Sequence, residues 1–124
     1  MEASEYHEQL LDVAAASPYF ESISLDYSAG AEEDCYVRGW IRLLSGHTLY
    51  IAEYLKLKPT PLIAKYRYQL LDADNNQVCR WDNAHHHPAI STHPHHEHLA
   101  DQGIYPSTVR NLDDVLLQLP RFIA

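Results

Sequence analysis

The 124-residue chain has only two cysteines, no long apolar run, and no lysine or arginine before Arg38. Cys35 and Cys79 lie far apart and form no CxxC motif, which argues against a disulfide scaffold and a thiolate zinc knuckle. No apolar stretch approaches the roughly 18 residues that indicate a membrane span. The N-terminus, "MEASEYHEQLL", carries acids where a signal peptide carries bases. We therefore expect a soluble, cytoplasmic protein with no membrane partner.

The net charge of −8 is unevenly distributed along the chain. Residues 1–34 contain nine of the seventeen acids and none of the nine lysines and arginines, so the remainder is near neutral. A protein that binds long duplexes normally has a basic face, which the chain as a whole does not indicate. A local site could still become cationic if its histidines are protonated near a phosphate. The acidic segment is either a solvated face or a docking surface for a basic partner.

Length and a 46% hydrophobic content fit one domain over residues 1–124. An amphipathic helix is expected over residues 4–16, with Ser4 as N-cap and an apolar stripe of Tyr6, Leu10, Val13 and Ala14. Runs rich in β-branched and aromatic residues predict strands at 19–28, 36–44, 47–58, 62–72 and 78–82. Asn111 is expected to cap a last helix over 112–119, which Pro120 ends. The predicted fold is α+β and two-layered: an antiparallel meander sheet of four to five strands with an N-terminal and a C-terminal helix on one face.

Strand alternation assigns side chains to the two faces of this sheet. Tyr50, Ala52, Tyr54 and Lys56 share one face, and Leu49, Ile51, Glu53 and Leu55 share the other. In the next strand Tyr66, Tyr68 and Leu70 oppose Lys65, Arg67 and Gln69. The chain has nine tyrosines. They are interpreted first as half-buried sheet residues, and alternatively as a stacking platform for unpaired bases.

Seven of the nine histidines lie within residues 85–98, in "WDNAHHHPAISTHPHHEH". Prolines make a long helix unfavourable here, and in extended chain residues two apart face the same side. His85 with His87, His93 with His95, and His96 with His98 could then form pairs. Such pairs can chelate zinc, nickel or copper, or act as general acid and base on a phosphodiester. No HExxH motif or structural zinc spacing is present, so a metal site rests on histidine density alone.

The neighbours of the histidines favour acid–base chemistry. Asp82 could orient or charge a histidine, and Arg67 and Arg80 could neutralise a phosphate. The remaining interpretation is a polar surface loop, which has no need for so many imidazoles.

The stretch "KYRYQLLDADNNQVCRWDNAHHHPAISTHPHHEH", followed by "GIYPS" and "LDDVLLQL", resembles the TumE family of bacterial toxins from toxin–antitoxin modules. The resemblance covers residues 65–120 best and agrees with the N-terminal half mainly in layout. His85 departs from the family pattern, which usually has proline there, and His93 stands where phenylalanine is more frequent. The family motif falls on Tyr66, Arg67, Tyr68, Asp82, Asn83, His86, His87, Pro88, Pro94, His95, His96 and His98.

The resemblance implies a growth-inhibiting toxin that acts on RNA and is held by a cognate helix-turn-helix antitoxin. Our hypothesis is a metal-independent endoribonuclease with no cofactor. One histidine of His86 and His87, and one of His95, His96 and His98, would exchange protons with the ribose 2′-hydroxyl and the leaving oxygen. Asp82 would set a histidine tautomer. Substrate-binding roles fall to Arg67 on the phosphate, to Tyr66 or Tyr68 stacking a base, and to Arg80 and Asn83.

Two alternatives from other classes remain open. The first is a metal-binding or sensing module in which His93, His95, His96 and His98 hold a divalent ion such as zinc, nickel or manganese. EDTA would then lower its melting temperature. The second is a non-enzymatic interaction protein whose acidic helix docks a basic partner. A homodimer is compatible with each, because an exposed aromatic sheet face suits association.

Overall fold

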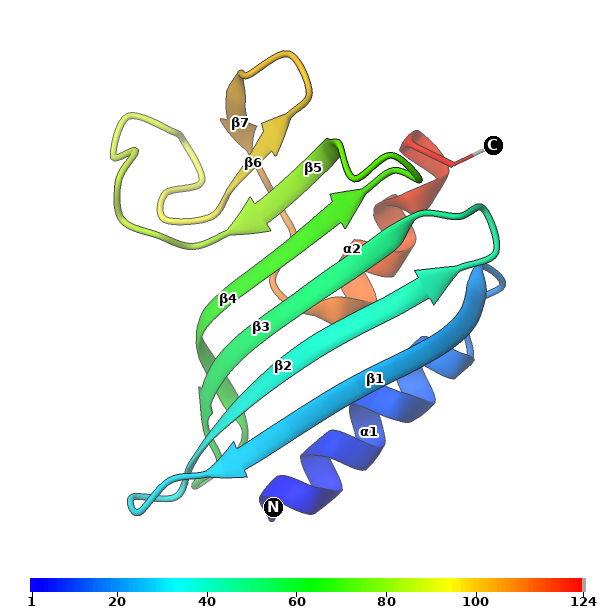
Figure 1. Ribbon diagram of the computed structural model, residues 1–124. Coiled ribbons are helices and arrows are strands. Elements are labelled where there is room, and N and C mark those ends of the chain that lie inside the picture. Colours follow the sequence, from blue (N-terminus) through cyan, green and yellow to red (C-terminus); the bar gives the residue numbers. More distant parts are fainter. Residues whose placement is uncertain (124) are drawn as a thin grey trace.

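The computed structural model describes residues 1–123, which form two α-helices, a 3₁₀ turn and seven strands (Figure 1). The helices are α1 (Ala3–Ala15) and α2 (Leu112–Gln118), and the turn is η1 (Leu119–Arg121). The strands are β1 (Phe20–Ala29), β2 (Asp34–Leu43), β3 (Thr48–Lys56), β4 (Leu62–Leu71), β5 (Gln77–Asp82), β6 (His96–Leu99) and β7 (Ile104–Pro106).

The strands make one antiparallel sheet in the order of the chain, from β1 to β7. The predicted meander and its α+β class are confirmed, and β1 to β5 lie within about two residues of the predicted positions. The predicted number of four to five strands is too low. β6 and β7, with four and three residues, are too short to show alternation in sequence, and they form because the chain returns to pair with β5.

The helix ends show how local sequence fixes the elements. α1 begins with a capping box between Glu2 and Glu5, which corrects the prediction of Ser4 as N-cap. The Asn111 side chain accepts a hydrogen bond from the backbone N–H of Asp114, so the predicted cap of α2 is confirmed. Pro120 lies in η1, directly after α2. None of the helices within residues 1–123 is long and apolar enough to span a membrane.

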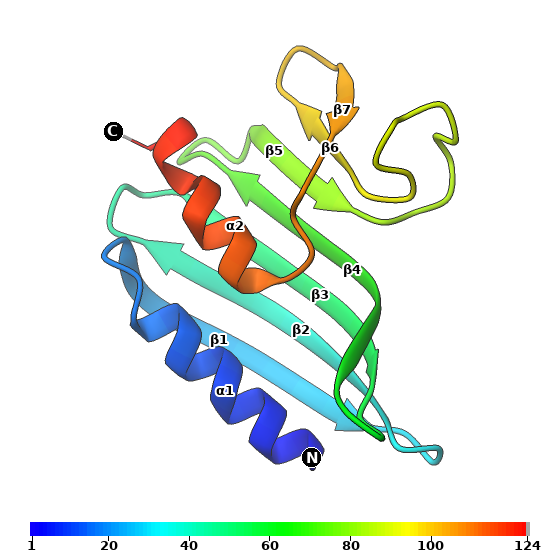
Figure 2. The same cartoon turned by 180° about the vertical axis from the view of Figure 1, so that it is seen from behind.

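Both helices cover the same face of the sheet (Figure 2). α1 buries Tyr6, Leu10 and Ala14 against β1 and β2, and α2 lies over the middle strands. The predicted shared face of Leu49, Ile51, Glu53 and Leu55 in β3 is confirmed, and the structure shows that this face is buried: Glu53 is only 3% exposed. Its carboxylate accepts hydrogen bonds from the hydroxyls of Tyr6 and Tyr68, and burial raises its pKa. The core thus contains one fully enclosed polar contact that joins helix to sheet.

The other face of the sheet carries no helix from residues 1–123 (Figure 1). Six of the nine lysines and arginines point from it: Arg38, Arg42, Lys56, Lys65, Arg67 and Arg80. The helix layer, in contrast, is acidic, with exposed Glu5, Glu8 and Asp12 on α1 and Asp113 on α2. The fold therefore gathers most of the lysines and arginines of an acidic protein on its open face.

Candidate functional site

The histidine-rich segment leaves β5, forms a loop over residues 83–95, and returns as β6. The register pairs Asp82 with His96 and Arg80 with His98. Since residues two apart in a strand point the same way, these four side chains all lie on the open face. The β5–β6 pairing therefore brings the acid, the arginine and two histidines together.

Asp82 is the centre of this group and is 7% exposed. One carboxylate oxygen lies 2.9 Å from Nε2 of His96 and accepts the backbone N–H of Ala84 at 3.0 Å. The other accepts from Nε of Arg80 at 3.1 Å and lies 3.5 Å from Nε2 of His98. Both oxygens of this enclosed carboxylate therefore have polar partners, as buried polar groups require.

His96 is almost fully enclosed, at 2% exposure. Its Nδ1 lies 2.9 Å from the carbonyl oxygen of Pro94, and its Nε2 faces Asp82. A carbonyl can only accept, so Nδ1 must donate. Both ring nitrogens therefore face oxygen atoms, one of a backbone carbonyl and one of a carboxylate. His96 is therefore fixed in orientation by its two neighbours.

His98 has a different environment. Its Nε2 accepts a hydrogen bond from Nη2 of Arg80 at 3.0 Å, because a guanidinium can only donate. Burial, followed by the charge of Arg80, lowers the pKa of His98 below its usual 6.5, although Asp82 opposes this shift. His98 is thus neutral at neutral pH and available as a proton acceptor once Arg80 leaves Nε2.

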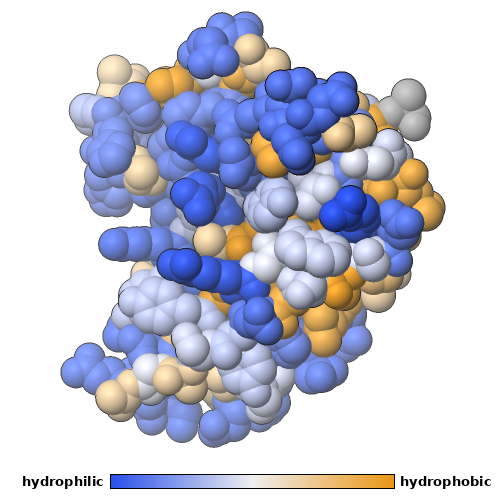
Figure 3. All heavy atoms as spheres, viewed as in Figure 1, coloured by the Kyte–Doolittle hydropathy of each residue, from blue (hydrophilic) through white to orange (hydrophobic). Residues whose placement is uncertain are grey.

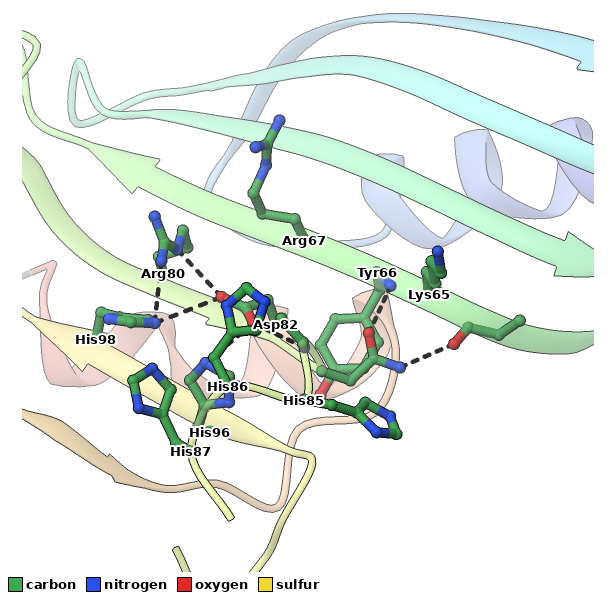
Figure 4. A pocket seen from close by; sticks show the side chains of 13 residues that line it. Lys65, Tyr66, Arg67, Arg80, Asp82, His85, His86, His87, His96 and His98 are labelled. Atoms are coloured by element: carbon green, nitrogen blue, oxygen red, sulfur yellow. Dashed lines mark hydrogen bonds and ion pairs between the residues drawn. The ribbon is translucent and has the colours of Figure 1, made fainter. Parts of the chain in front are cut away.

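His87 completes the cluster from the loop. Its ring centroid lies 5.0 Å from that of His96 and 5.9 Å from that of His98. One ligand atom from each of the three lies within 4.8 Å of the others. They line an open cavity of about 600 Å³, which we call the histidine pocket (Figure 4). Its other lining residues are Ala64, Lys65, Tyr66, Arg67, Arg80, Asp82, Asn83, Ala84, His85 and His86.

The structure separates His95 from the histidine pocket. The ring of His95 stacks on Tyr66, and its Nδ1 donates to the Tyr66 hydroxyl at 2.8 Å, since that hydroxyl donates to the carbonyl of Val109. His93 packs against His85, with ring centroids 5.3 Å apart. Of the predicted metal set of His93, His95, His96 and His98, the structure brings together only His96 and His98, and His87 is the third member of their cluster.

The structure does not place Tyr66 and Tyr68 where the predicted base stacking would need them, because both rings are buried. Tyr66 is 5% and Tyr68 0% exposed, and both hydroxyls are engaged on the helix-covered side. Asn83 lines the pocket, but its amide accepts from the backbone N–H of Tyr66 and donates to the carbonyl of Ala64, so it fixes the edge of β4.

Two cations of β4 border the pocket. Arg67 and Lys65 both point from the open face, and Figure 4 shows the Arg67 side chain directed away from Asp82 and the histidines. Lys65 was missed from the sequence. The alternation of side chains along β4 could have identified Lys65 as a pocket residue, because it places Lys65 on the same face as Arg67.

Comparison with known families gives a match over nearly the whole chain: the model described as Toxin TumE matches residues 10–124. The chain belongs to the TumE toxin family. The resemblance that the histidine motif suggested is therefore confirmed. No curated protein and no solved structure matches the chain.

In this TumE toxin, the motif histidines divide between two locations. His86, His87, His96 and His98 line the histidine pocket, and His95 lies outside it. The two histidines that depart from the family pattern, His85 and His93, contact each other in the β5–β6 loop, and His85 also lines the histidine pocket. The motif is thus one sequence cluster but several structural positions.

Proposed function

We propose that this TumE toxin is an endoribonuclease that cleaves RNA in the cytoplasm by histidine acid–base chemistry, without a metal. The observation that carries the proposal is the convergence of His87, His96 and His98 with Asp82 and Arg80 in one open pocket. Toxin family membership supports a growth-inhibiting role.

In the proposed reaction, the ribose 2′-oxygen attacks the adjacent phosphorus and the bond from phosphorus to the 5′-oxygen breaks. The neutral imidazole of His98 takes the 2′-hydroxyl proton, and His87 gives a proton to the leaving oxygen, which leaves a 2′,3′-cyclic phosphate. The substrate phosphate draws Arg80 away from Nε2 of His98, a contact now 3.0 Å long, and so frees the base. His96, held by Asp82 and Pro94, is a positioning residue.

The test uses purified protein treated with EDTA and incubated with a single-stranded RNA. We expect cyclic phosphate ends, and we expect His87→Ala and His98→Gln each to lower the cleavage rate by about 100-fold or more. His95→Ala should retain most of the rate because His95 lies outside the pocket. His47→Ala, in the β2–β3 turn, is the matched control. Cleavage at the wild-type rate by both pocket variants would overturn the assignment.

A second candidate function uses the same pocket with a divalent metal. His87, His96 and His98 offer three nitrogen ligands, and the Asp82 carboxylate lies beside His96. His96 already donates Nδ1–H to a backbone carbonyl, an arrangement that orients metal-binding histidines. Zinc prefers four such N and O ligands. Zinc at about 100 times its Kd should then stabilise the fold by about 2.7 kcal/mol in thermal unfolding.

Two variants separate these candidates. His87→Ala should abolish a zinc-dependent rise in Tm, and His95→Ala should not. Cleavage that appears only with added zinc or manganese would make the histidines ligands, whereas unchanged cleavage in EDTA supports the metal-free reaction.

We also propose that a cognate helix-turn-helix antitoxin is the partner of this toxin, which family membership supports. Expression of the toxin alone should arrest growth, and co-expression with that antitoxin should restore it. Light scattering of the purified toxin then tests for a homodimer.

A further inference from the structure

The outward side chains of β2, β3 and β4 form a regular pattern beside the histidine pocket. The register aligns Arg38, Ala52 and Arg67 in one row across the three strands, and the row continues to Asp82 on β5. Because the middle position is alanine, the row is low between its two arginines, and Asp26 on β1 lies opposite Arg38. The row runs directly toward the pocket.

Aromatic residues flank this row on both sides. Tyr36 pairs with Tyr54 on one side, with ring centroids 4.6 Å apart, and Trp40 pairs with Tyr50 on the other. Two hollows of about 200 and 260 Å³ lie along these flanks, and both are lined by Arg38, Ala52 and Arg67. Figure 3 shows this face, where strongly hydrophilic side chains alternate with paler ones. We call Tyr36, Arg38, Trp40, Tyr50, Ala52, Tyr54 and Arg67 the sheet track.

The aromatic rings of the sheet track are accessible. Tyr36 is 48% and Tyr50 42% exposed, and Trp40 is half-buried. The large aromatic rings of the core, in contrast, are covered by the helices. Exposed rings on an uncovered sheet cost free energy in water unless something stacks on them.

The guanidinium groups of the sheet track are not used by the fold. Within residues 1–123, no carboxylate lies within 4.0 Å of the charged nitrogens of Arg38 or Arg67. Arg42 lies over the ring of Trp40 at 5.4 Å and adds a third cation at the border. The chain is strongly acidic, so three such arginines on one open face mark a surface for an anionic ligand.

We propose that the sheet track binds single-stranded RNA and directs it into the histidine pocket. Unpaired bases stack on Trp40, Tyr36 and their partners, and Arg38 and Arg67 contact the phosphates. A duplex fits poorly because its bases are already stacked on each other. The distance from β2 to β5 is three strand spacings, about 14 Å, enough for two or three nucleotides. The inference rests on the proposed function for the identity of the anion as RNA.

The experiment measures binding without cleavage. The probe is a fluorescent 2′-O-methyl oligouridylate of about nine nucleotides, which has no free 2′-hydroxyl to attack the phosphate. Fluorescence anisotropy gives Kd for the wild type, Trp40→Ala and Tyr36→Ala. Each substitution should raise Kd about fivefold or more, since stacking on one aromatic side chain contributes about 1–3 kcal/mol. Trp40→Phe keeps a π face and should bind within about twofold of wild type.

Charge is tested separately. Arg38→Ala should weaken binding and lower the slope of log K against log salt by about 0.7, the value for one lost contact to a single strand. Arg38→Lys should restore much of that slope. Lys58→Ala and Tyr105→Ala are the controls: Lys58 lies in the β3–β4 loop and Tyr105 on the helix side of β7, and both should leave Kd unchanged.

The outcomes distinguish this inference from the proposed function. Loss of probe binding in the track variants supports the track even if no variant cleaves RNA. Cleavage by the wild type together with equal probe affinity in Trp40→Ala, Tyr36→Ala and Arg38→Ala overturns the track and leaves the nuclease proposal standing. The sheet track is also overturned if polyglutamate displaces the probe and Trp40→Ala leaves the probe Kd unchanged. The open face would then be a docking surface for an acidic protein.

Discussion

The Asp82 carboxylate is the point where the structure makes its sharpest prediction about stability. Asp82→Asn preserves the shape of the side chain and removes its charge. In the contact between His96 and Asp82 the side chains are 2% and 9% exposed, so the pair is buried. Removing one partner of a buried pair costs about 3–5 kcal/mol of stability. The Arg80 side is 34% exposed and adds about 1 kcal/mol at most.

We take the lower end of the first range, because the asparagine oxygen can still accept from Nε2 of His96. The total is about 3–4 kcal/mol, which corresponds to a fall in Tm of about 12 °C for a domain of this size. Circular dichroism during heating measures it. Asp74→Asn, on the exposed β4–β5 turn, is the matched control and should change Tm by less than about 2 °C.

A double-mutant cycle isolates the pair. His96→Gln combined with Asp82→Asn should cost less than the sum of the two single substitutions, with a coupling of about 1–3 kcal/mol. Our account of the site would be refuted if the two substitutions had additive effects on stability. It would also be refuted if Asp82→Asn had the same Tm as the Asp74→Asn control.

Three further predictions concern the core. Burial raises the pKa of Glu53, so its contribution to the free energy of unfolding is complete below the unfolded value near 4.5 and is lost as the pH rises through the folded pKa. Urea titrations should therefore show wild type losing stability relative to Glu53→Gln as the pH rises above 4.5. A pH-independent difference would contradict this. Burial raises the pKa of Cys79 to about 12 and also raises the pKa of Cys35. After treatment with an alkylating reagent at neutral pH, mass spectrometry should therefore find both thiols unmodified until urea unfolds the protein. A Cβ at Gly39 would lie 1.9 Å from the carbonyl oxygen of Ser24. Gly39→Ala should therefore destabilise the fold by about 1–3 kcal/mol. An unchanged midpoint of urea unfolding would contradict this and show that β1 can shift to make room.

Local pattern was sufficient for most of the fold. Alternation in "HTLYIAEYLKLK" placed Glu53 on the same face as Leu49 and Ile51, and the structure confirms that shared face and buries it. The partners of Glu53 could not be predicted in the same way. Tyr6 lies 47 residues away in the chain, and only the packing of α1 on the sheet brings it there. β6 and β7 were missed for a related reason, because short strands depend on pairing with β5 rather than on their own sequence.

The candidate site shows the same limit. Spacing predicted correctly that His96 and His98 face the same side, because they occupy one strand. It could not predict that His87 rather than His95 joins them, since an irregular loop with two prolines has no periodicity. In β4, alternation already placed Arg67 on one face of the strand and Tyr66 and Tyr68 on the other. One RNA strand bound to a single face could therefore not contact all three side chains.

The gathering of lysines and arginines on the open face has a consequence for how fast the protein meets its target. Exposed acids on α1 and α2 give the helix layer a negative potential, and the open face carries Arg38, Arg42 and Arg67. A polyanion that diffuses toward the helices is repelled, and one that approaches the sheet is attracted. The electrostatic field therefore turns the open face toward an approaching polyanion. The rate constant for association with a polyanion should then be higher than the net charge of −8 suggests, and it should fall as ionic strength rises.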